Sequence, residues 1–381
     1  MAEVSTLFPQ TYEESRARFR QDIDLVQRFW PDARLGSHCL VRTGDEPLTI
    51  DWIQAEGLQS KERLLLFTTG EHGVEGYVGS AMLQLFLDEF LPRLEPVRTG
   101  TGLLLVHAIN PWGMKHRRRT NEGNVDLNRN FVWPTHSLGE SFNPDYGRLD
   151  SFLNPAVPVD SLFWGNISFL LRLLRLAVSL GPQRFRHTML LGQVRFPRGT
   201  YYGGESLQEE TRVLMDLYRN HIRDYEQIVH LDMHTGYGPR YQMSMVNSWM
   251  EPRESKELER QFSYPLVVKT NQSEFYSIRG DMIDYVYTLV HNEFPDKRLY
   301  ATSFEFGTMG DSLFATLRSL RTMILENQMY WFGARNRKAR KRIERDFQEL
   351  FAPREERWRA KALADARQAF QGILRAEGFL S

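Results

Sequence analysis

Two polar residues near position 70 have the types and the spacing to bind one metal ion. In the stretch GEHGVEG (70–76), His72 and Glu75 directly follow the apolar run RLLLFTT. Side chains three residues apart lie on the same side of a helical turn or a tight bend, so both could reach one ion. Gly70 and Gly73 would let the backbone bend sharply there. The alternative is a plain polar turn, because an H-x-x-E spacing can arise by chance in a chain with 10 histidines.

A third ligand is expected from His234, which closes the run EQIVHLDMH. A catalytic zinc site takes three ligands from His, Glu or Asp and leaves one position open. His230 is a rival on the same side of the strand, but it would lie about 13 Å deeper at ~3.3 Å per residue, so we interpret it as a core histidine. Asp232 either orients His234 or is a buried hydrogen-bonding acid. The motif H-E-x-x-H is absent, and a single cysteine, Cys39, excludes a thiolate site.

Strands and helices alternate along the chain in the order of an α/β fold. Strand-like runs cover residues 64–69, 102–110, 226–234, 264–270 and 299–307, and helical runs cover 79–91, 209–223, 282–293 and 311–331. Buried strands flanked by helices predict a mixed, largely parallel twisted sheet with helices on both faces. Ligands of such folds bind at the carboxyl ends of the strands. The three candidate metal ligands all stand at such ends.

The same edge of the sheet should receive an acid and several arginines. Glu305 closes the run LYATSFEFG, in an otherwise apolar strand where an unpaired carboxylate is costly to bury. A structural acid is possible there, but a position facing a metal site explains the cost better. The loop after the 102–110 strand, NPWGMKHRRRTNEGNVDLNRNF, is long, polar and rich in arginine.

Composition limits the classes of partner. Lysine plus arginine (48) equal aspartate plus glutamate (48), which argues against nucleic acid as a primary partner. The amino-terminal stretch has no apolar signal segment, so a cytoplasmic protein is expected. The most apolar stretch, 162–180, is interrupted by Arg172 and Arg175. We expect it to pack on the body of the protein with its arginines outward, and we expect no membrane partner. Oligomeric state is not indicated.

The pattern also predicts how the chain divides. Residues 1–333 form the α/β domain, and 134–200 interrupt its rhythm with prolines, glycines and one helix, as an insertion would. Residues 334–381 are expected to form a charged helical extension. Its basic segment RNRKARKRIER is followed at once by acids, which favours a solvated helix face over a binding patch.

Four phrases together resemble a known family. GEHGVEG, RTNEGNVDLNRNF, DMHTG and SFEFG are similar, in the same order, to the motifs of the zinc carboxypeptidases of the carboxypeptidase A type. That superfamily also includes the succinylglutamate desuccinylase and aspartoacylase deacylases. The resemblance implies one zinc ion bound by His72, Glu75 and His234. It covers the chain between Glu71 and Gly307 but not the insertion or the carboxyl-terminal extension.

The resemblance also implies roles for residues that contact the substrate. Asn128 and Arg129 would grip a terminal carboxylate, and Arg119 would polarise the carbonyl of the bond that is cut. Glu305 would be the general base. Each has a structural alternative: Arg129 could be a buried ion-paired arginine, and the neighbours of Arg119, at positions 117 and 118, compete for its place.

A further phrase, YSIRGDMIDYVY (276–287), resembles the carboxypeptidase segment that carries a mobile tyrosine. By that likeness Tyr276 caps the substrate and Ile283 lines the specificity pocket, although Tyr276 could also be an ordinary loop aromatic. An apolar Ile283 favours an uncharged or hydrophobic terminal side chain on the substrate.

Three hypotheses for the function follow. The first is a metallocarboxypeptidase-type zinc hydrolase that cleaves an amide bond next to a free carboxylate in a small peptide or peptide-like molecule. The second is a deacylase or amidase of N-acyl amino acids. The third is an inactive binding or scaffold protein on the same fold, which would be favoured by loss of a ligand or of the base. None of those residues is missing from the sequence.

Overall fold

The computed structural model describes residues 4–40, 47–133, 142–270 and 279–380. Eight strands form one sheet in the order β1-β2-β4-β3-β5-β8-β6-β7. Their bounds are β1 (Arg34–Cys39), β2 (Thr49–Ala55), β3 (Arg63–Thr69), β4 (Thr101–His107), β5 (Gln227–Thr235), β6 (Met243–Asn247), β7 (Val267–Lys269) and β8 (Arg298–Phe306). The predicted strands all occur, while β1, β2 and β6 were not predicted.

The four central strands, β4, β3, β5 and β8, run parallel to one another. The edges are mixed, because β1, β2 and β6 pair antiparallel with their inner neighbours. The predicted fold class, a mixed and largely parallel sheet with helices, is confirmed. The carboxyl ends of the parallel strands therefore meet at one edge, as the position of the polar residues required.

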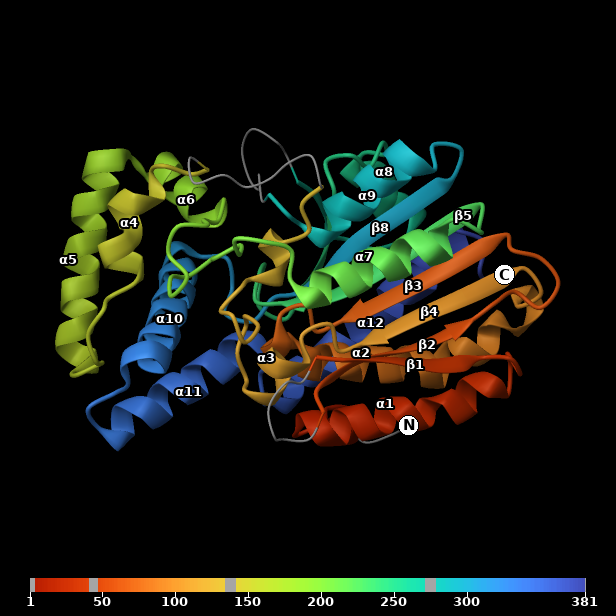
Figure 1. Cartoon of the computed structure of the whole chain (residues 1–381), viewed down its shortest axis with the longest axis horizontal. Coiled ribbons are helices and arrows are strands. Elements are labelled where there is room, and N and C mark those ends of the chain that lie inside the picture. The colour runs from red at the N-terminus through yellow and green to blue at the C-terminus, as the bar shows by residue number, and fades with distance from the viewer. Residues whose placement is uncertain (1–3, 41–46, 134–141, 271–278, 381) are drawn as a thin grey trace.

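Helices cover both faces of the sheet (Figure 1). Their bounds are α1 (Tyr12–Gln27), α2 (Gly76–Glu89), α3 (Pro111–Lys115), α4 (Tyr146–Leu153), α5 (Leu162–Leu180), α6 (Pro182–Leu190), α7 (Glu209–Ile222), α8 (Ser255–Gln261), α9 (Met282–Glu293), α10 (Leu313–Phe332), α11 (Arg337–Phe351) and α12 (Glu356–Ala376). Successive side chains of β3 point alternately into two hydrophobic cores. Leu65 and Phe67 pack with α1, α2 and α12, and Leu64 and Leu66 pack with α7 and α9.

The predicted carboxyl-terminal extension is helical, and its last helix belongs to the main core. Trp358, Phe370 and Ile373 of α12 are almost fully buried beneath the sheet. Helix α11 joins α10, and its far end reaches the metal-ligand loop, where Phe347 and Phe351 pack against Val74. Most of the charge of this region lies on the outer faces of the helices, while their inner faces are apolar apart from Asp365, which accepts a hydrogen bond from the Met243 N–H.

The predicted insertion contributes α4, α5 and α6, which lie beside α10 at one end of the molecule (Figure 1). They share a small core of their own with α10, built on residues such as Phe152, Phe169 and Ile324. Within the described residues, α5 alone is long and apolar enough to span a membrane by length and composition. Phe169 is its one buried residue. The helix packs against α4, α6 and α10 by one side, with Arg172 and Arg175 exposed as expected, but most of its surface is left uncovered.

Candidate metal centre

The first two candidate ligands stand where β3 ends. His72 caps the short 3-10 helix η2 (Gly73–Glu75), so the imidazole and the Glu75 carboxylate lie on one side of a single tight turn. Gly70 takes a positive φ of 73°, which suits glycine best. A Cβ at Gly73 would lie 2.1 Å from the carbonyl carbon of Gly113, so this position has no room for a side chain.

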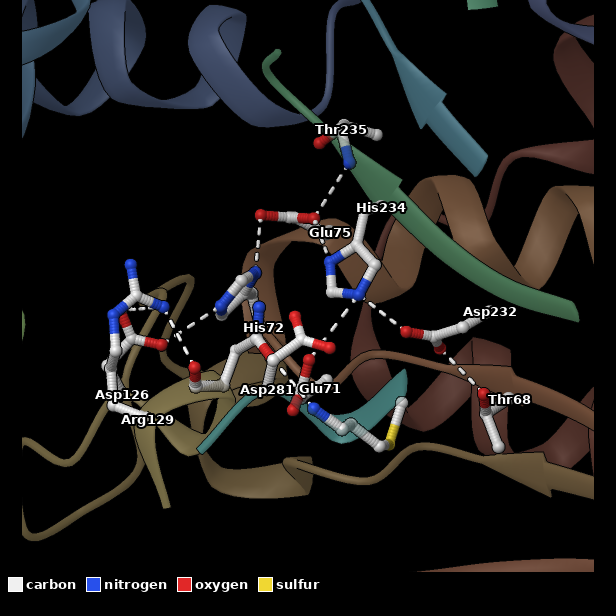
Figure 2. A network of polar contacts seen from close by, with 12 residues as sticks. Thr68, Glu71, His72, Glu75, Asp126, Arg129, Asp232, His234, Thr235 and Asp281 are labelled. Atoms are coloured by element: carbon white, nitrogen blue, oxygen red, sulfur yellow. Dashed lines mark hydrogen bonds and ion pairs between the residues drawn. The ribbon is translucent and has the colours of Figure 1, made fainter. Parts of the chain in front are cut away.

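The third candidate ligand comes from the neighbouring parallel strand. His234 is the second-last residue of β5, and β5 pairs directly with β3. Glu75 lies between the two imidazoles (Figure 2). Its Oε1 is 2.9 Å from His72 Nδ1, and its Oε2 is 3.3 Å from His234 Nδ1. One ligand atom from each of the three residues lies within 4.8 Å of the others.

The outer nitrogen of each imidazole is held by an aspartate. His72 Nε2 lies 3.0 Å from Asp126 Oδ1, and His234 Nε2 lies 2.5 Å from Asp232 Oδ2. Thr68 donates a hydrogen bond of 2.6 Å to the other oxygen of Asp232. With a metal bound, these contacts would hold the protons on the outer nitrogens and leave both Nδ1 atoms for the ion. Of the two alternatives for Asp232, the structure favours the orienting partner.

The carboxylates and imidazoles of this buried cluster shift one another's pKa values. Burial alone would raise the pKa of Glu75, but the adjacent imidazoles of His72 and His234 hold it well below its usual range. Burial would likewise lower the pKa of His234, but Asp232 and Glu75 raise it instead. Without an ion, the cluster therefore keeps an ionised carboxylate between two imidazoles. A divalent cation would take the place of the bound protons.

Asp126 is the main residue that the sequence analysis missed. It is 1% exposed and directly precedes the 3-10 helix η4 (Leu127–Arg129), at its N-cap position. Burial would raise its pKa, yet Arg119, Arg129 and His72 hold it well below the usual range. An aspartate between two apolar residues in the phrase VDLNRNF was the available signal. Its partner, however, stands 54 positions away.

Glu71 and Asp281 add two more acids that were not predicted to be part of the site. Glu71 directly precedes His72 and is 1% exposed, with neither carboxylate oxygen hydrogen-bonded; its Oε2 lies 3.4 Å from His234 Nε2. Burial raises its pKa well above the usual value, with Asp232 and Asp281 contributing and His234 opposing. Figure 2 shows Asp281 beside Glu71. The adjacent acid in GEHG was a visible but unspecific signal.

The three consecutive arginines of the long loop point to three different places. Arg119 reaches the candidate ligands: its Nε lies 3.2 Å from Asp126 Oδ2 and its Nη1 lies 3.4 Å from Glu75 Oε1. Arg117 bonds Gln348 and the carbonyl of Gln10, and Arg118 pairs with Glu326 of α10. The geometry therefore separates Arg119 from its two neighbours, which the sequence could not do.

The two candidate carboxylate-binding residues lie on the arginine side of the cluster. Arg129 is 3% exposed, and its Nε has no hydrogen-bond partner. Its Nη1 donates to the carbonyl of Asn128 and lies 3.9 Å from Asp126 Oδ2. Asn128 accepts a hydrogen bond from the backbone N–H of Met282, which leaves its amide N–H groups for another partner. A buried guanidinium with a free donor fits an incoming carboxylate.

Glu305 stands beside His234 in the sheet, because these two residues are paired in the parallel register of β5 and β8. Its Oε2 is buried and has no hydrogen-bond partner. Burial raises the pKa of Glu305 to about 8, with Glu75 adding to the shift while His234 and Arg119 oppose it. His230, by contrast, is fully buried and bonded to Thr68 at 2.8 Å, as expected of a core histidine.

Only one of the two predicted specificity residues lies within the described structure. Tyr276 lies outside the described residues, so its role stays a prediction. Ile283 borders a cavity of about 30 Å³, but most of the other walls are polar: Asn247, Ser248, Thr270, Asp281, Asp284 and Ser303. Ser248 donates a 2.5 Å hydrogen bond to Asp284, whose pKa burial and Asp281 raise to about 7. This small cavity does not test the specificity pocket, so the role of Ile283 stays a prediction.

A much larger cavity, of about 740 Å³, opens at the opposite edge of the sheet. Gln227 and Arg298, the first residues of β5 and β8, line it together with Arg253 and Glu377. It contains none of the candidate metal ligands. Size alone would therefore have pointed to the wrong end of the parallel strands.

The residues present fit a metal ion on their own chemistry. His72 Nδ1 is buried and has no hydrogen-bond partner. The three residues His72, Glu75 and His234 each offer a ligand atom within 4.8 Å of the other two. Two imidazoles and one carboxylate, with acids behind both imidazoles, are a donor set that zinc takes in catalytic sites. Which divalent ion occupies the site is a matter of geometry and supply.

Comparison with known proteins gives a family and a set of distant folds. The chain matches the family described as "Protein of unknown function (DUF2817)" over residues 8–365 and belongs to that family. No curated protein matches the chain. The function must therefore be argued from the site itself.

Among solved structures, carboxypeptidase A from Helicoverpa armigera shares 14% identity, with a TM-score of 0.48, over 90% of this chain and 74% of that one. Bovine thrombin-activatable fibrinolysis inhibitor shares 13%, with a TM-score of 0.44, over 82% of this chain and 94% of that one. A succinylglutamate desuccinylase from a Silicibacter species shares 15%, with a TM-score of 0.36, over 79% and 67%.

Proposed function

We propose that this protein is a zinc-dependent hydrolase that cleaves an amide bond next to a free carboxylate, acting as a carboxypeptidase on peptides or peptide-like molecules. One observation carries the proposal. The His72, Glu75 and His234 cluster lies between Glu305, on the neighbouring strand, and two arginines, the partly exposed Arg119 and the buried Arg129. An acid on one side and two guanidinium groups on the other match the needs of amide hydrolysis at a carboxylate-bearing substrate.

The arginine side fixes the substrate. Arg129 has a buried Nε without a partner, and a planar fork of donors binds a carboxylate in two places, which lysine cannot do. Asn128, held by the Met282 amide, can add a further donor. These contacts would place the neighbouring amide carbonyl towards Arg119, whose guanidinium is anchored by Asp126. The substrate is therefore expected to carry its free carboxylate one residue from the bond that is cut.

The acid side moves the proton. A zinc ion bound by the three ligands would supply a Lewis acid and lower the pKa of a water molecule. Glu305, with its unpartnered Oε2, accepts the proton of the attacking water and passes it to the departing amine. Arg119 donates to the oxygen that becomes negative in the tetrahedral intermediate. Asp126 and Asp232 keep both imidazoles in the tautomer that leaves Nδ1 free.

The test combines metal content with turnover. Purified protein is analysed for metal per chain and is assayed on a panel of blocked dipeptides and N-acyl amino acids. The Glu305→Gln variant is the test, and Glu122→Gln, an exposed glutamate in the arginine-rich loop, is the matched control. We expect about one zinc per chain in all three proteins. Dipeptide hydrolysis should fall ~10²–10⁴-fold in Glu305→Gln and stay unchanged in the control.

Other results would change the conclusion. Turnover confined to N-acyl amino acids would identify a deacylase on the same site. Protein without stoichiometric metal and without turnover on either set would leave the scaffold hypothesis. Equal turnover by Glu305→Gln and wild type would remove Glu305 from the chemistry.

A further inference from the structure

The outer face of α5 is a continuous apolar surface that nothing in the described structure covers. The exposed apolar residues recur at helical spacing along the whole helix: Phe163 67%, Trp164 68%, Ile167 38%, Leu170 54%, Leu171 65%, Leu174 63% and Val178 80% exposed. At 100° per residue they occupy about one third of the helix circumference. Scattered apolar residues are normal on a surface, but a stripe of this length marks an interaction site.

This stripe is separate from the face that holds the helix in place. Phe169 is buried, and Leu173, Leu176 and Leu180 are partly buried against α4, α6 and α10. Arg321 of α10 also bonds Asn166 at 3.2 Å. Helix α5 is therefore apolar on two sides, one used for folding and one left open. Figure 1 shows the open helix at the extreme end of the molecule, on the far side of α4 and α10 from the sheet.

The segment that contains the stripe is rich in arginine and lies between two acids, Asp160 and Glu205. Residues 161–204 contain six arginines and no aspartate or glutamate, although the whole chain has a formal net charge of zero. Two of the arginines, Arg172 and Arg175, are exposed on α5 itself, and two more, Arg184 and Arg186, lie on α6. Arg184 pairs with Asp145, and Arg172 donates to the Ser151 hydroxyl. An apolar stripe beside exposed arginines is complementary to a partner that has an apolar interior and anionic groups at its surface.

We propose that the outer face of α5 docks on an anionic lipid bilayer, with the helix lying in the plane of the interface. Aromatic and leucine side chains on one face and arginines beside them are the pattern of interfacial helices. Each arginine near an anionic leaflet adds attraction that weakens with salt. The helix does not span the bilayer, because its opposite face is engaged by protein and Arg172 stands at its middle. The proposal is independent of the hydrolase function and replaces the expectation of no membrane contact.

A second copy of the chain fits the same face less well. Two copies meeting through α5 would bring two arginine-rich, acid-free segments together, and like charges at an interface cost binding energy. A dimer through this face is therefore the competing outcome of the test.

The experiment is sedimentation of the full-length protein with vesicles. Vesicles of phosphatidylcholine and phosphatidylglycerol in equal amounts are compared with vesicles of phosphatidylcholine alone, at low and at high salt. The variants are Leu170→Glu/Leu174→Glu, which places two acids in the stripe, and Leu58→Glu, a control at an exposed leucine outside the insertion. Thermal unfolding checks that each variant folds.

Wild type and the Leu58→Glu control should bind the anionic vesicles, more weakly at high salt and on phosphatidylcholine alone. The double variant should bind at least ~10-fold less tightly. Two results would overturn the proposal. One is wild-type protein that binds neither vesicle. The other is light scattering that shows a dimer of wild type converted to monomer by the double variant, which would assign the stripe to a second copy.

Discussion

The metal centre and the insertion differ in which side chains they bury and which they expose. At the metal centre, polar groups are buried. The candidate ligands are paired, because Glu75 contacts both imidazoles and each imidazole has its own aspartate, while Glu71 and Glu305 keep buried oxygens without a hydrogen-bond partner. In the insertion, apolar groups are exposed and unmatched along a whole helix. Burying a charge or exposing an apolar stripe both cost stability, so each region points to a partner that removes the cost. Single substitutions should therefore have large effects on activity at the centre and small effects on folding along the stripe.

After Glu305→Gln, the largest effect is expected for Arg119→Ala. Removing a donor to a developing oxyanion lowers kcat ~10²–10³-fold. Because Arg119 also pairs with Asp126 and Glu75, metal content and kcat are measured together for Ala and Lys variants. Loss of kcat with metal retained supports the catalytic role. Loss of metal in proportion to kcat would make Arg119 a structural residue.

The next effect is a pH-dependent stability. Burial raises the pKa of Glu305 to about 8 from its ordinary 4.5. The folded state therefore keeps a proton that the unfolded chain loses, and metal-free wild type should lose stability as the pH rises from 4.5 to about 8. At ~1.4 kcal/mol per pKa unit this is at most a few kcal/mol.

Glu305→Gln has no proton to lose there, so its advantage in Tm over wild type should grow with pH in chelator-treated protein. Thermal unfolding of both proteins across the window measures this. A difference in Tm that is constant with pH would show that burial does not shift this carboxyl.

For substrate binding, Arg129→Gln should raise KM ~10–100-fold for substrates with a free carboxylate, since a hydrogen bond to a charged group contributes ~1.5–3 kcal/mol. The same substrates with an amidated terminus provide the control and should show little change between wild type and variant. Equal loss on both would mean that Arg129 supports the fold around Asp126 instead of binding the carboxylate.

Behind the ligands, Asp126→Asn should weaken metal affinity ~10–100-fold, because an outer partner fixes the tautomer and orientation of a metal-bound imidazole. Competition with a chromogenic chelator measures the affinity. Asp232→Asn is the matched change on the other imidazole and should behave alike. An unchanged affinity in both variants would show that the two aspartates do not orient the ligands.

The smallest effect is expected on the open face of α5. Leu174→Ser should change the free energy of unfolding by no more than ~0.5 kcal/mol, whereas Phe169→Ala on the packed face should cost ~3 kcal/mol or more. Urea unfolding of both variants tests the contrast. A large loss from Leu174→Ser would show that the stripe is needed for folding, and the difference between the two regions would disappear.

The two regions also differ in how far the sequence could predict them. The candidate ligands were accessible because each one stands at the end of a predictable strand, and strand ends converge in this fold. The partnership of Asp126 with His72 was not, since it depends on how a long loop returns across the sheet edge. The family resemblance pointed to Arg119, but the contacts that separate it from Arg117 and Arg118 needed the same information.

For the insertion, the periodicity of residues 162–180 correctly predicted a helix. It could not say which of two apolar faces would be covered, because both carry leucines. The short strand MSMVN (243–247) was missed because it has few β-branched residues. The burial of α12 was hidden by a charged outer face that dominates its composition.

Two hydrogen bonds between the carboxyl end of α11 and residues beside the metal centre bear on the order of events during synthesis. Thr235, next to His234, donates to the carbonyl of Phe351, and Thr308 donates to that of Leu350. Because synthesis runs from the amino to the carboxyl end at ~5–20 residues per second, α11 is made after the other elements around the site. A nascent chain that has emerged only as far as α10 would contain all the candidate ligand residues but not the two carbonyls of α11. Stable metal loading should therefore follow the synthesis of α11.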